Sequence, residues 1–255
     1  MKANFSRSIL IAFILMLILT PVRTFSQSES SNFSIGTDVV SRYIWRGLNL
    51  GGSSPHIQPY VEYAFGNSGL SVGAWGSHSM GASSTGAEAD IYLSYSFMDM
   101  FSIGITDYFF PSDRQFAMDS YFDYDSETTS HTLEAMLSFD GTESFPVSIM
   151  FAMNFYGADG TDENGDNYMA KYLEIGYSTS LPDGEISVFA GAALDDPKEE
   201  EGAVGWYGNS AGIINLGTSV SKSIKITDDY SLPISSSLIF NPEAENIYLV
   251  FGVSF

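Results

Sequence analysis

The residues of this sequence that could do chemistry are two arginines and several carboxylates, placed at alternate positions among apolar residues. In an extended segment, side chains an even number of positions apart point to the same side. By this rule Asp38, Arg42 and Arg46 share one side of the first apolar segment. Charges are costly on a lipid-facing surface, so we expect them to point into an enclosed interior.

The same rule assigns polar residues of five later segments to that interior. The predicted interior set is Asp38, Arg42, Arg46, Gln58, Tyr60, Glu62, Trp75, Asp90, Glu134 and Glu174, with His56 and Glu88 beside them. Two interpretations stay open. The arginines could face carboxylates across a narrow constriction that selects solutes by charge, or they could form ion-pair networks that fill a small barrel. Trp75 would narrow the interior or stack on a sugar.

An enzyme would have to use the histidines, of which there are three: His56, His78 and His131. Only His56 shares the polar side of its segment. No H-E-x-x-H spacing occurs, and the two G-x-S-x-G matches, Gly69–Gly73 and Gly208–Gly212, do not join a predicted strand to a predicted helix, which is the context that a nucleophile elbow needs. We therefore predict no enzyme and no catalytic residue, with a hydrolase at the barrel rim as a minor alternative.

The acidic run from Asp159 to Asp166 has oxygen ligands near a glycine, but it lacks the spacing and closing glutamate of an EF-hand loop. Cysteine is absent, which excludes thiolate sites and disulfides. We predict solvated loop acids, with no metal and no cofactor.

The elements that must position these residues are best seen at the end of the chain. Ile247, Leu249, Phe251, Val253 and Phe255 occupy every second position, with smaller or mixed residues between them. A strand with one wholly apolar face is an aggregation hazard in a soluble protein, but it suits the lipid-facing wall of a transmembrane barrel.

Similar alternation recurs along the chain and predicts about twelve strands. The expected strands are 33–46, 55–65, 69–78, 88–97, 101–109, 131–139, 146–157, 168–180, 185–194, 211–223, 230–240 and 245–255. The segments 101–109 and 211–223 are less regular, and either could contain a bulge. We expect an all-β protein, an antiparallel transmembrane up-and-down β-barrel.

The connections alternate in length. Those after even-numbered strands are mostly short, such as 66–68, 98–100 and 182–184, and those after odd-numbered strands are mostly longer and more acidic, such as 111–130, 158–167 and 195–210. Outer-membrane barrels have short periplasmic turns and long external loops.

The N-terminus fits export. Basic Lys2 and Arg7 precede an apolar run, and small residues follow near Ser26. We therefore predict a signal peptide at 1–26 and one barrel domain at 27–255, in the outer membrane of a Gram-negative-type bacterium.

Composition agrees with this prediction. The net charge is −21, and it becomes −24 without residues 1–26, which hold three basic residues and no acid. Such a chain repels nucleic acid. Aromatic residues make up 15% and charged residues only 16%, below the usual quarter. Interfacial girdles are the expected positions of Tyr43, Trp45, Tyr63, Phe65, Tyr95, Phe97, Phe109 and Phe155.

Several stretches resemble a known family. They are Asp38–Gly47 with Arg42-Tyr43-Ile-Trp45-Arg46, Ser54–Pro59, Gly69–Ser77, Glu88–Tyr92 and Tyr172–Tyr177. The mature chain resembles the TorF family, described as porins and also as a Gcw_chp-type family. The resemblance implies a barrel more specifically than it implies a transported solute.

We expect passive diffusion of small hydrophilic solutes or ions. The acidic loops should make the outer mouth attract cations. The expected partners are outer-membrane lipid and those solutes. The alternative is a non-conducting barrel that serves as a structural or surface-binding protein.

Overall fold

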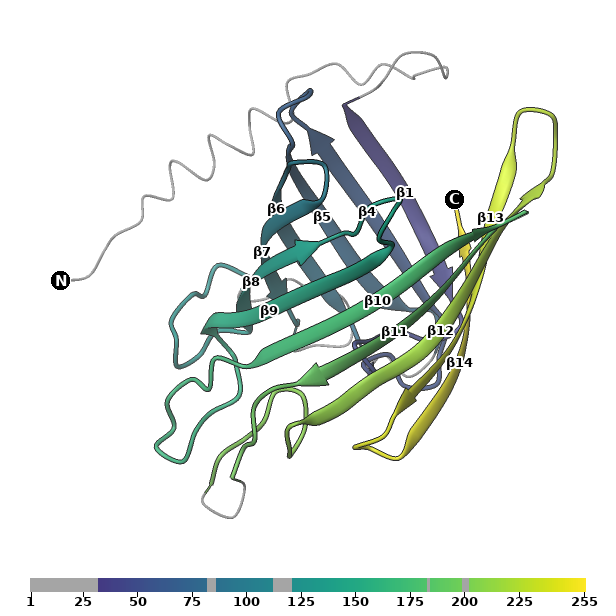
Figure 1. Ribbon diagram of the computed structural model, residues 1–255. Helices are drawn as coiled ribbons and strands as arrows, with labels where there is room; N and C mark the ends of the chain where they lie inside the picture. Colours follow the sequence, from purple (N-terminus) through teal and green to yellow (C-terminus); the bar gives the residue numbers. More distant parts are fainter. Residues whose placement is uncertain (1–31, 82–85, 112–120, 183, 199–201) are drawn as a thin grey trace. The chain divides into compact units, whose positions relative to one another are not determined.

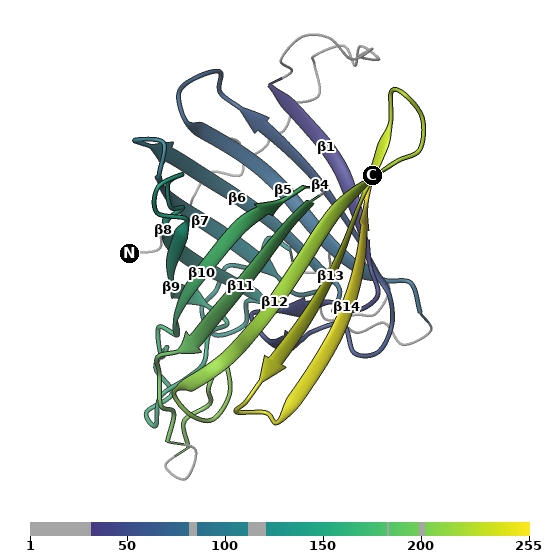
Figure 2. The ribbon, with the colours of Figure 1, turned by 45° about the vertical axis from the view of Figure 1, so that its right-hand side comes forward.

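The computed structural model describes residues 32–81, 86–111, 121–182, 184–198 and 202–255. Within these residues, twelve antiparallel strands close into a barrel (Figures 1 and 2). The barrel strands are β1 (Phe33–Val40), β4 (His56–Ala64), β5 (Leu70–Ser79), β6 (Glu88–Phe97), β7 (Phe101–Phe109), β8 (His131–Phe139), β9 (Val147–Gly157), β10 (Lys171–Leu181), β11 (Gly184–Ala193), β12 (Gly212–Lys225), β13 (Ser231–Asn241) and β14 (Asn246–Ser254). The predicted all-β, up-and-down barrel of about twelve strands is confirmed.

The barrel closes between the first and last strands. β14 pairs with β1 through Asp38 opposite Ser254 and Val40 opposite Gly252. Beyond β14, Phe255 exchanges two backbone hydrogen bonds with Thr37, at 3.1 and 2.9 Å. Closure leaves no unpaired strand edge, so an apolar outer wall does not become an aggregation site.

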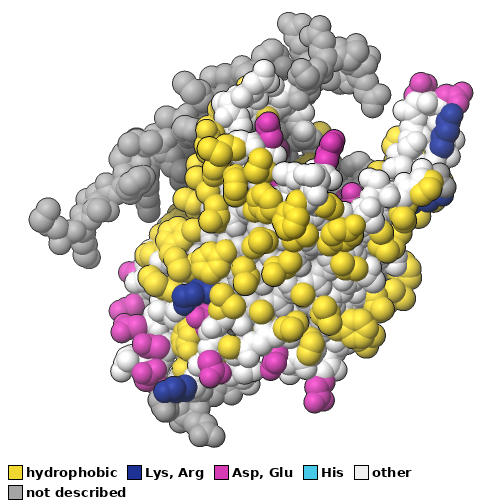
Figure 3. Space-filling view, in the orientation of Figure 1, with side chains coloured by type: hydrophobic (Ala, Val, Ile, Leu, Met, Phe, Trp, Pro, Cys, Tyr) yellow, Lys and Arg dark blue, Asp and Glu magenta, His cyan; other side chains and the backbone are white. Residues whose placement is uncertain are grey.

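Side chains alternate across the wall as the sequence predicts. In β14, Ile247, Leu249 and Phe251 are exposed by 55% or more, whereas Tyr248 between them is 9% exposed. A similar alternation is clear in β6, and exposed apolar side chains spread over the outside of the barrel (Figure 3). Most polar residues of the strands consequently line the inside, with exceptions such as His131 of β8 and Lys222 of β12.

Aromatic rings gather at the end of the barrel with the short turns. The Tyr63 and Phe65 rings meet edge to face at 5.0 Å, the Tyr95 and Phe97 rings stack at 5.8 Å, and Phe97 stacks on Phe101 at 5.7 Å. Phe101 continues this row to Phe139, at 5.3 Å. This arrangement matches the predicted girdle at the ends of these strands.

Two predicted girdle residues lie elsewhere, and a third is covered. Tyr43 and Trp45 lie inside the barrel, against Trp75 and Tyr108. Phe109 does lie on the outer face, but it is only 1% exposed because Tyr121 and His131 pack against its ring. The prediction was wrong for Tyr43 and Trp45 because the chain leaves the barrel wall after Val40. For Phe109, alternation along a strand does not reveal that a loop covers its outer face.

The strand boundaries differ most at the first strand, which ends at Val40 rather than at residue 46. Segment 101–109 is regular in both of its pairings. The register shift opposite β12 falls between Gly191 and Ala192, so the suspected bulge in 211–223 is confirmed. Another shift lies between Leu133 and Glu134, where β8 pairs with β9.

Short turns at one end of the barrel alternate with longer connections at the other. The short turns include 65–69, 98–100 and 226–230, and the longest connections include 110–130, 158–170 and 194–211. Among the described residues no helix is long and apolar enough to cross a membrane.

Candidate functional site

The segment 41–55, between β1 and β4, folds into the interior of the barrel, and we call it the inserted segment. It contains a small hairpin of β2 (Ile44–Trp45) and β3 (Leu48–Asn49). Arg46 and Gly47 form the hairpin turn with positive φ angles of 49° and 79°. A two-residue turn with positive φ at both positions suits a tight hairpin.

Gly47 is required by packing as well as by its backbone angle. A Cβ atom at this position would lie 1.8 Å from the carbonyl oxygen of Ile214, in β12. The carbonyl of Gly47 also accepts a hydrogen bond from Asn241 Nδ2 of β13, at 3.2 Å. The tip of the hairpin therefore rests directly against the far wall of the barrel.

Tyr43 and Trp45 of the inserted segment contact strands β5, β6 and β7. The Tyr43 hydroxyl donates to Glu88 of β6 at 2.7 Å, and its ring lies 5.6 Å from Trp75 of β5. The Trp45 ring meets Tyr108 of β7 edge to face at 5.6 Å and stacks on Tyr207 at 5.9 Å. The inserted segment thus crosses the lumen and touches strands on opposite sides.

Arg46 makes the main electrostatic contact of the hairpin. Its two terminal nitrogens each donate to one carboxylate oxygen of Glu134, the Nη2–Oε1 pair at 2.9 Å. Nη1 also donates to the Tyr207 hydroxyl at 2.6 Å, and the guanidinium lies 4.5 Å from the Trp45 ring and 4.7 Å from the Tyr172 ring. The side chains of Arg46 and Glu134 are 8% and 2% exposed.

Neighbouring phenols complete this ion pair. Tyr108 donates its hydroxyl to Glu134 Oε1 at 3.0 Å. Burial raises the pKa of Tyr207, which keeps its phenol neutral beside Arg46. A buried ion pair is tolerated when its charges are paired and further hydrogen bonds satisfy them, and both conditions hold here.

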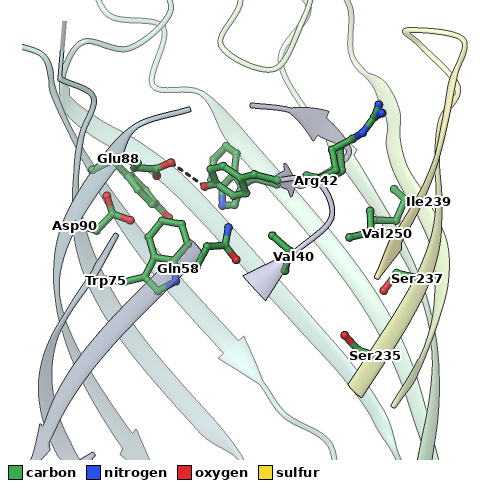
Figure 4. A pocket seen from close by; sticks show the side chains of 14 residues that line it. Val40, Arg42, Gln58, Trp75, Glu88, Asp90, Ser235, Ser237, Ile239 and Val250 are labelled. Atoms are coloured by element: carbon green, nitrogen blue, oxygen red, sulfur yellow. Dashed lines mark hydrogen bonds between the residues drawn. The ribbon is translucent and has the colours of Figure 1, made fainter. Parts of the chain in front are cut away.

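A cavity of about 340 Å³ lies beside the inserted segment (Figure 4). Glu88, Asp90, Trp75 and Gln58 line one side, and β1, β13 and β14 form the other. That opposite side is lined by Val40, Ser235, Ser237, Ile239 and Val250.

Arg42 also lines this cavity, with its guanidinium turned away from the two acids in Figure 4. It lies 5.8 Å from the centre of the Tyr248 ring. Within the described residues Arg42 has no ion-pair partner, in contrast to Arg46.

The structure therefore separates the predicted interior residues into groups. Arg42, Gln58, Trp75 and Asp90 meet around the cavity, whereas Arg46 and Glu134 form the buried ion pair. Glu174 accepts hydrogen bonds from Tyr172 at 2.5 Å and from Asn215 at 2.8 Å.

The remaining members also face inward. Glu62 accepts from Tyr92 at 3.1 Å and from Ser71 at 3.3 Å, and Tyr60 covers Gly36. Asp38 pairs in register with inward-facing Gln58 and with Ser254. The barrel-strand members of the predicted set share the inner side of the wall, whereas Arg42 and Arg46 come from the inserted segment and not from a barrel strand.

Sequence reasoning missed the aromatic partners of the arginines. Tyr43, Trp45 and Tyr207 contact the charged groups, and Tyr43 and Trp45 were assigned to the girdle. The pair Arg46-Gly47 was the available signal, because a glycine in an alternating segment indicates a turn or a close backbone approach.

Small polar residues line part of the lumen, some near the short turns and some beside the cavity. Hydrogen-bonded serine pairs face inward, Ser71 with Ser94 at 2.7 Å and Ser219 with Ser237 at 2.9 Å. Hydroxyls offer exchangeable hydrogen bonds and no fixed charge. These serines make the wall hydrophilic, beside the carboxylates of Glu62 and Glu185.

The histidines have structural partners. His56 is completely buried, with Nδ1 2.9 Å from Ser77 Oγ and Nε2 3.2 Å from the Gly51 carbonyl. Ser77 is 1% exposed, so a substrate cannot reach this Ser–His pair. The contact with Gly51 holds the inserted segment against β4.

His131 lies on the outer face of β8. Its Nδ1 is 2.7 Å from Asp107 Oδ1, and its Nε2 is 2.7 Å from the Tyr121 carbonyl. The Tyr124 ring stacks on the imidazole at 4.1 Å. These contacts hold residues 121–130 against the barrel wall.

The loop acids take part in local hydrogen bonds. Backbone N–H groups of Asn164 and Asp166 donate to Asp162 at 2.8 and 3.0 Å, and they lower the pKa of its carboxyl. Asp159 accepts from Asn154 and from the Ala170 amide. In the part of the chain that the structure describes, no group of three or more His, Asp or Glu side chains is arranged to hold a metal.

Comparison with known proteins gives a family and a distant structural likeness. The family model described as "Bacterial protein of unknown function (Gcw_chp)" matches residues 26–231. This match confirms the Gcw_chp part of the resemblance, whereas the TorF name stays a prediction. The solved structure titled "NanC porin structure in rhombohedral crystal form" aligns with a TM-score of 0.44 and 10% identity, over 87% of this chain and 98% of that chain. No curated protein matches.

The ion pair gives a stability prediction. The substitution Arg46→Met leaves the Glu134 carboxylate buried without its cation, which should lower the free energy of unfolding by about 3–5 kcal/mol. Urea unfolding of the purified barrel, followed by tryptophan fluorescence, measures the change.

The double variant Arg46→Met/Glu134→Gln is the matched control, because it removes both charges. It should recover most of the loss, since a neutral pair carries no uncompensated charge. Equal stability of the wild type and the single variant would show that the ion pair does not hold the inserted segment.

Proposed function

The chain belongs to the Gcw_chp family of bacterial proteins, whose function is unknown, and we propose that it is an outer-membrane channel for passive diffusion of small hydrophilic solutes. The observation that carries this proposal is the closed barrel with an apolar outside and a polar, partly open inside.

The outer wall supports a membrane location. A closed barrel satisfies every strand hydrogen bond internally, which hydrocarbon surroundings require. Its exposed apolar side chains would meet lipid, and the aromatic row at the short-turn end would lie at one interface. On this proposal residues 1–26 are an export signal, and the short turns face the periplasm.

The two arginines support different parts of the proposal. Arg46 is a structural residue, because Glu134, Tyr207 and two aromatic rings hold it. Arg42 lines the cavity opposite Asp90 and lacks an ion-pair partner among the described residues. The constriction that selects solutes therefore lies at Arg42 and Asp90, beside the inserted segment.

We propose a preference for cations. The chain carries a net charge of −21, and acids of connection 158–170 lie at the end where the long loops are. Because the pKa of Asp162 is lowered, its charge persists at neutral pH and is lost only as the pH falls through that lowered value. Focused negative potential raises the local concentration of cations.

One observation favours the alternative of a non-conducting structural or surface-binding barrel. The inserted segment contacts strands on opposite sides of the lumen, so it could seal the interior. A hydrolase at the rim has less support, because His56 and Ser77 are both buried.

Conductance separates the channel from the sealed barrel. The mature chain, residues 27–255, should give discrete current steps in planar bilayers, and Arg42→Ala/Arg46→Ala should give larger steps. The double variant removes two large side chains and their charge from the lumen, which lowers the steric and electrostatic barriers there.

Lys222→Ala/Lys225→Ala removes the same charge from β12 and should leave the steps unchanged, since Lys222 points outward and Lys225 is exposed near a short turn. A folded barrel that never conducts would support the structural or surface-binding role.

Ion preference is measured separately by the reversal potential in a KCl gradient. The wild type should pass potassium several-fold better than chloride, and Glu163→Gln/Asp166→Asn should reduce that ratio, because it removes two exposed loop charges. A reversal potential of the opposite sign would contradict the proposed cation preference.

A membrane location predicts that an added charge costs more stability on the outer face of the barrel than on the inner face. Leu249→Arg places a cation on the exposed apolar face and should cost about 2–4 kcal/mol if the site lies near the bilayer midplane. Ser221→Arg, on the inner face opposite Glu185, should cost much less. Urea unfolding in lipid vesicles measures both, and equal costs would argue against a lipid-facing outer wall.

A further inference from the structure

One carboxylate oxygen of Asp90 is buried without a hydrogen-bond donor among the described residues. Asp90 is 6% exposed, and the oxygen without a donor is its Oδ1 atom. A buried ionised carboxylate is costly unless a donor or a cation compensates it. Its side chain lines the cavity beside the inserted segment (Figure 4), so a group inside that cavity can supply the missing donor.

Glu88 is a second buried acidic residue beside Asp90, and it also favours a positive group in the cavity. It lies two positions before Asp90 on the same inner face of β6, is 1% exposed, accepts a hydrogen bond of 2.7 Å from Tyr43, and lies within hydrogen-bond reach of the Asp90 carboxyl. Two buried carboxylates so placed repel each other, and a cation in the cavity relieves the repulsion. The nearest arginine of the cavity, Arg42, is turned away from both (Figure 4).

The remaining walls suit an organic cation. Trp75 pairs across the strands with Asp90, and Tyr43, Trp45 and Tyr108 also line the cavity. Aromatic faces attract cations that have shed part of their hydration. A hard metal ion instead requires about six oxygen ligands, and no group of three acidic or histidine side chains in the described residues offers them.

From these observations we propose that the cavity binds the primary ammonium group of a small solute, with Asp90 Oδ1 as the acceptor, Glu88 as the second negative charge and Trp75 as the aromatic wall. A primary ammonium is preferred over a quaternary one because only the former can donate a hydrogen bond to the unpartnered oxygen. The volume of about 340 Å³ admits a molecule of a few non-hydrogen atoms together with water.

This inference names the solute class of the proposed channel and so rests on that function, but binding can be tested without any current. Isothermal titration of the purified full barrel in detergent uses four probes at constant ionic strength: propylammonium chloride, tetramethylammonium chloride, potassium chloride and propanol. Propylammonium should bind, whereas the other three should bind at least tenfold more weakly.

Asp90→Asn keeps the size of the side chain and removes its charge, and it should weaken propylammonium binding tenfold or more. Glu185→Gln removes the same charge from an inward-facing position outside the cavity and should change the affinity less than twofold. Heat-modifiable electrophoretic mobility shows that each variant is folded.

Every other outcome overturns the proposal. Equal binding of tetramethylammonium would show that the Asp90 oxygen receives no hydrogen bond from the ligand, and equal binding of potassium would indicate a simple ion site. No binding, or equal loss in both variants, would also refute it.

Current recordings distinguish the two proposals. A chain that conducts without binding propylammonium refutes only the ammonium site. One that binds propylammonium and never conducts refutes the channel and leaves the site as a receptor.

Discussion

The interior of this barrel depends on compensation of the charge of Arg46. A guanidinium carried into the lumen on a hairpin would be prohibitively costly alone. Glu134 on β8 neutralises it through two hydrogen bonds, while Tyr207 and two rings surround it. Because these partners come from separate strands and from connection 194–211, one ion pair fixes the inserted segment relative to much of the wall.

The position of that segment then determines what the rest of the lumen can do. Towards the short turns, serines leave a hydrophilic wall, whereas beside the hairpin aromatic rings and two carboxylates surround a smaller cavity. Small polar residues suit unselective passage of hydrated solutes, and the cavity with its charged groups suits discrimination. On the proposed function, the lumen would combine a broad approach with a narrow selective region.

Much of the fold could be predicted because successive side chains of a barrel strand alternate between the lipid-facing and inner sides, which gives the sequence a period of two. Outward apolar and inward polar residues alternate in β6 and in β14 as the sequence indicates. The alternation does not say where a strand leaves the wall. Arg42 to Arg46 continue the pattern of β1, yet the strand ends at Val40. Parity placed both arginines on the side of the polar residues, but it could not show that Arg46 is paired while Arg42 has no ion-pair partner among the described residues, since Glu134 lies far from Arg46 in the sequence.

The contacts of the inserted segment also indicate how a solute would have to pass. Gly47 lies directly under the Ile214 carbonyl, Asn241 holds its oxygen, and His56 holds Gly51. Displacing the hairpin would break these contacts together with the Arg46–Glu134 pair and would leave a charge buried alone. A path alongside the fixed hairpin requires none of these losses. The cavity between Asp90 and the wall formed by β1, β13 and β14 lies on that side, so selection and passage would share the same region of the lumen.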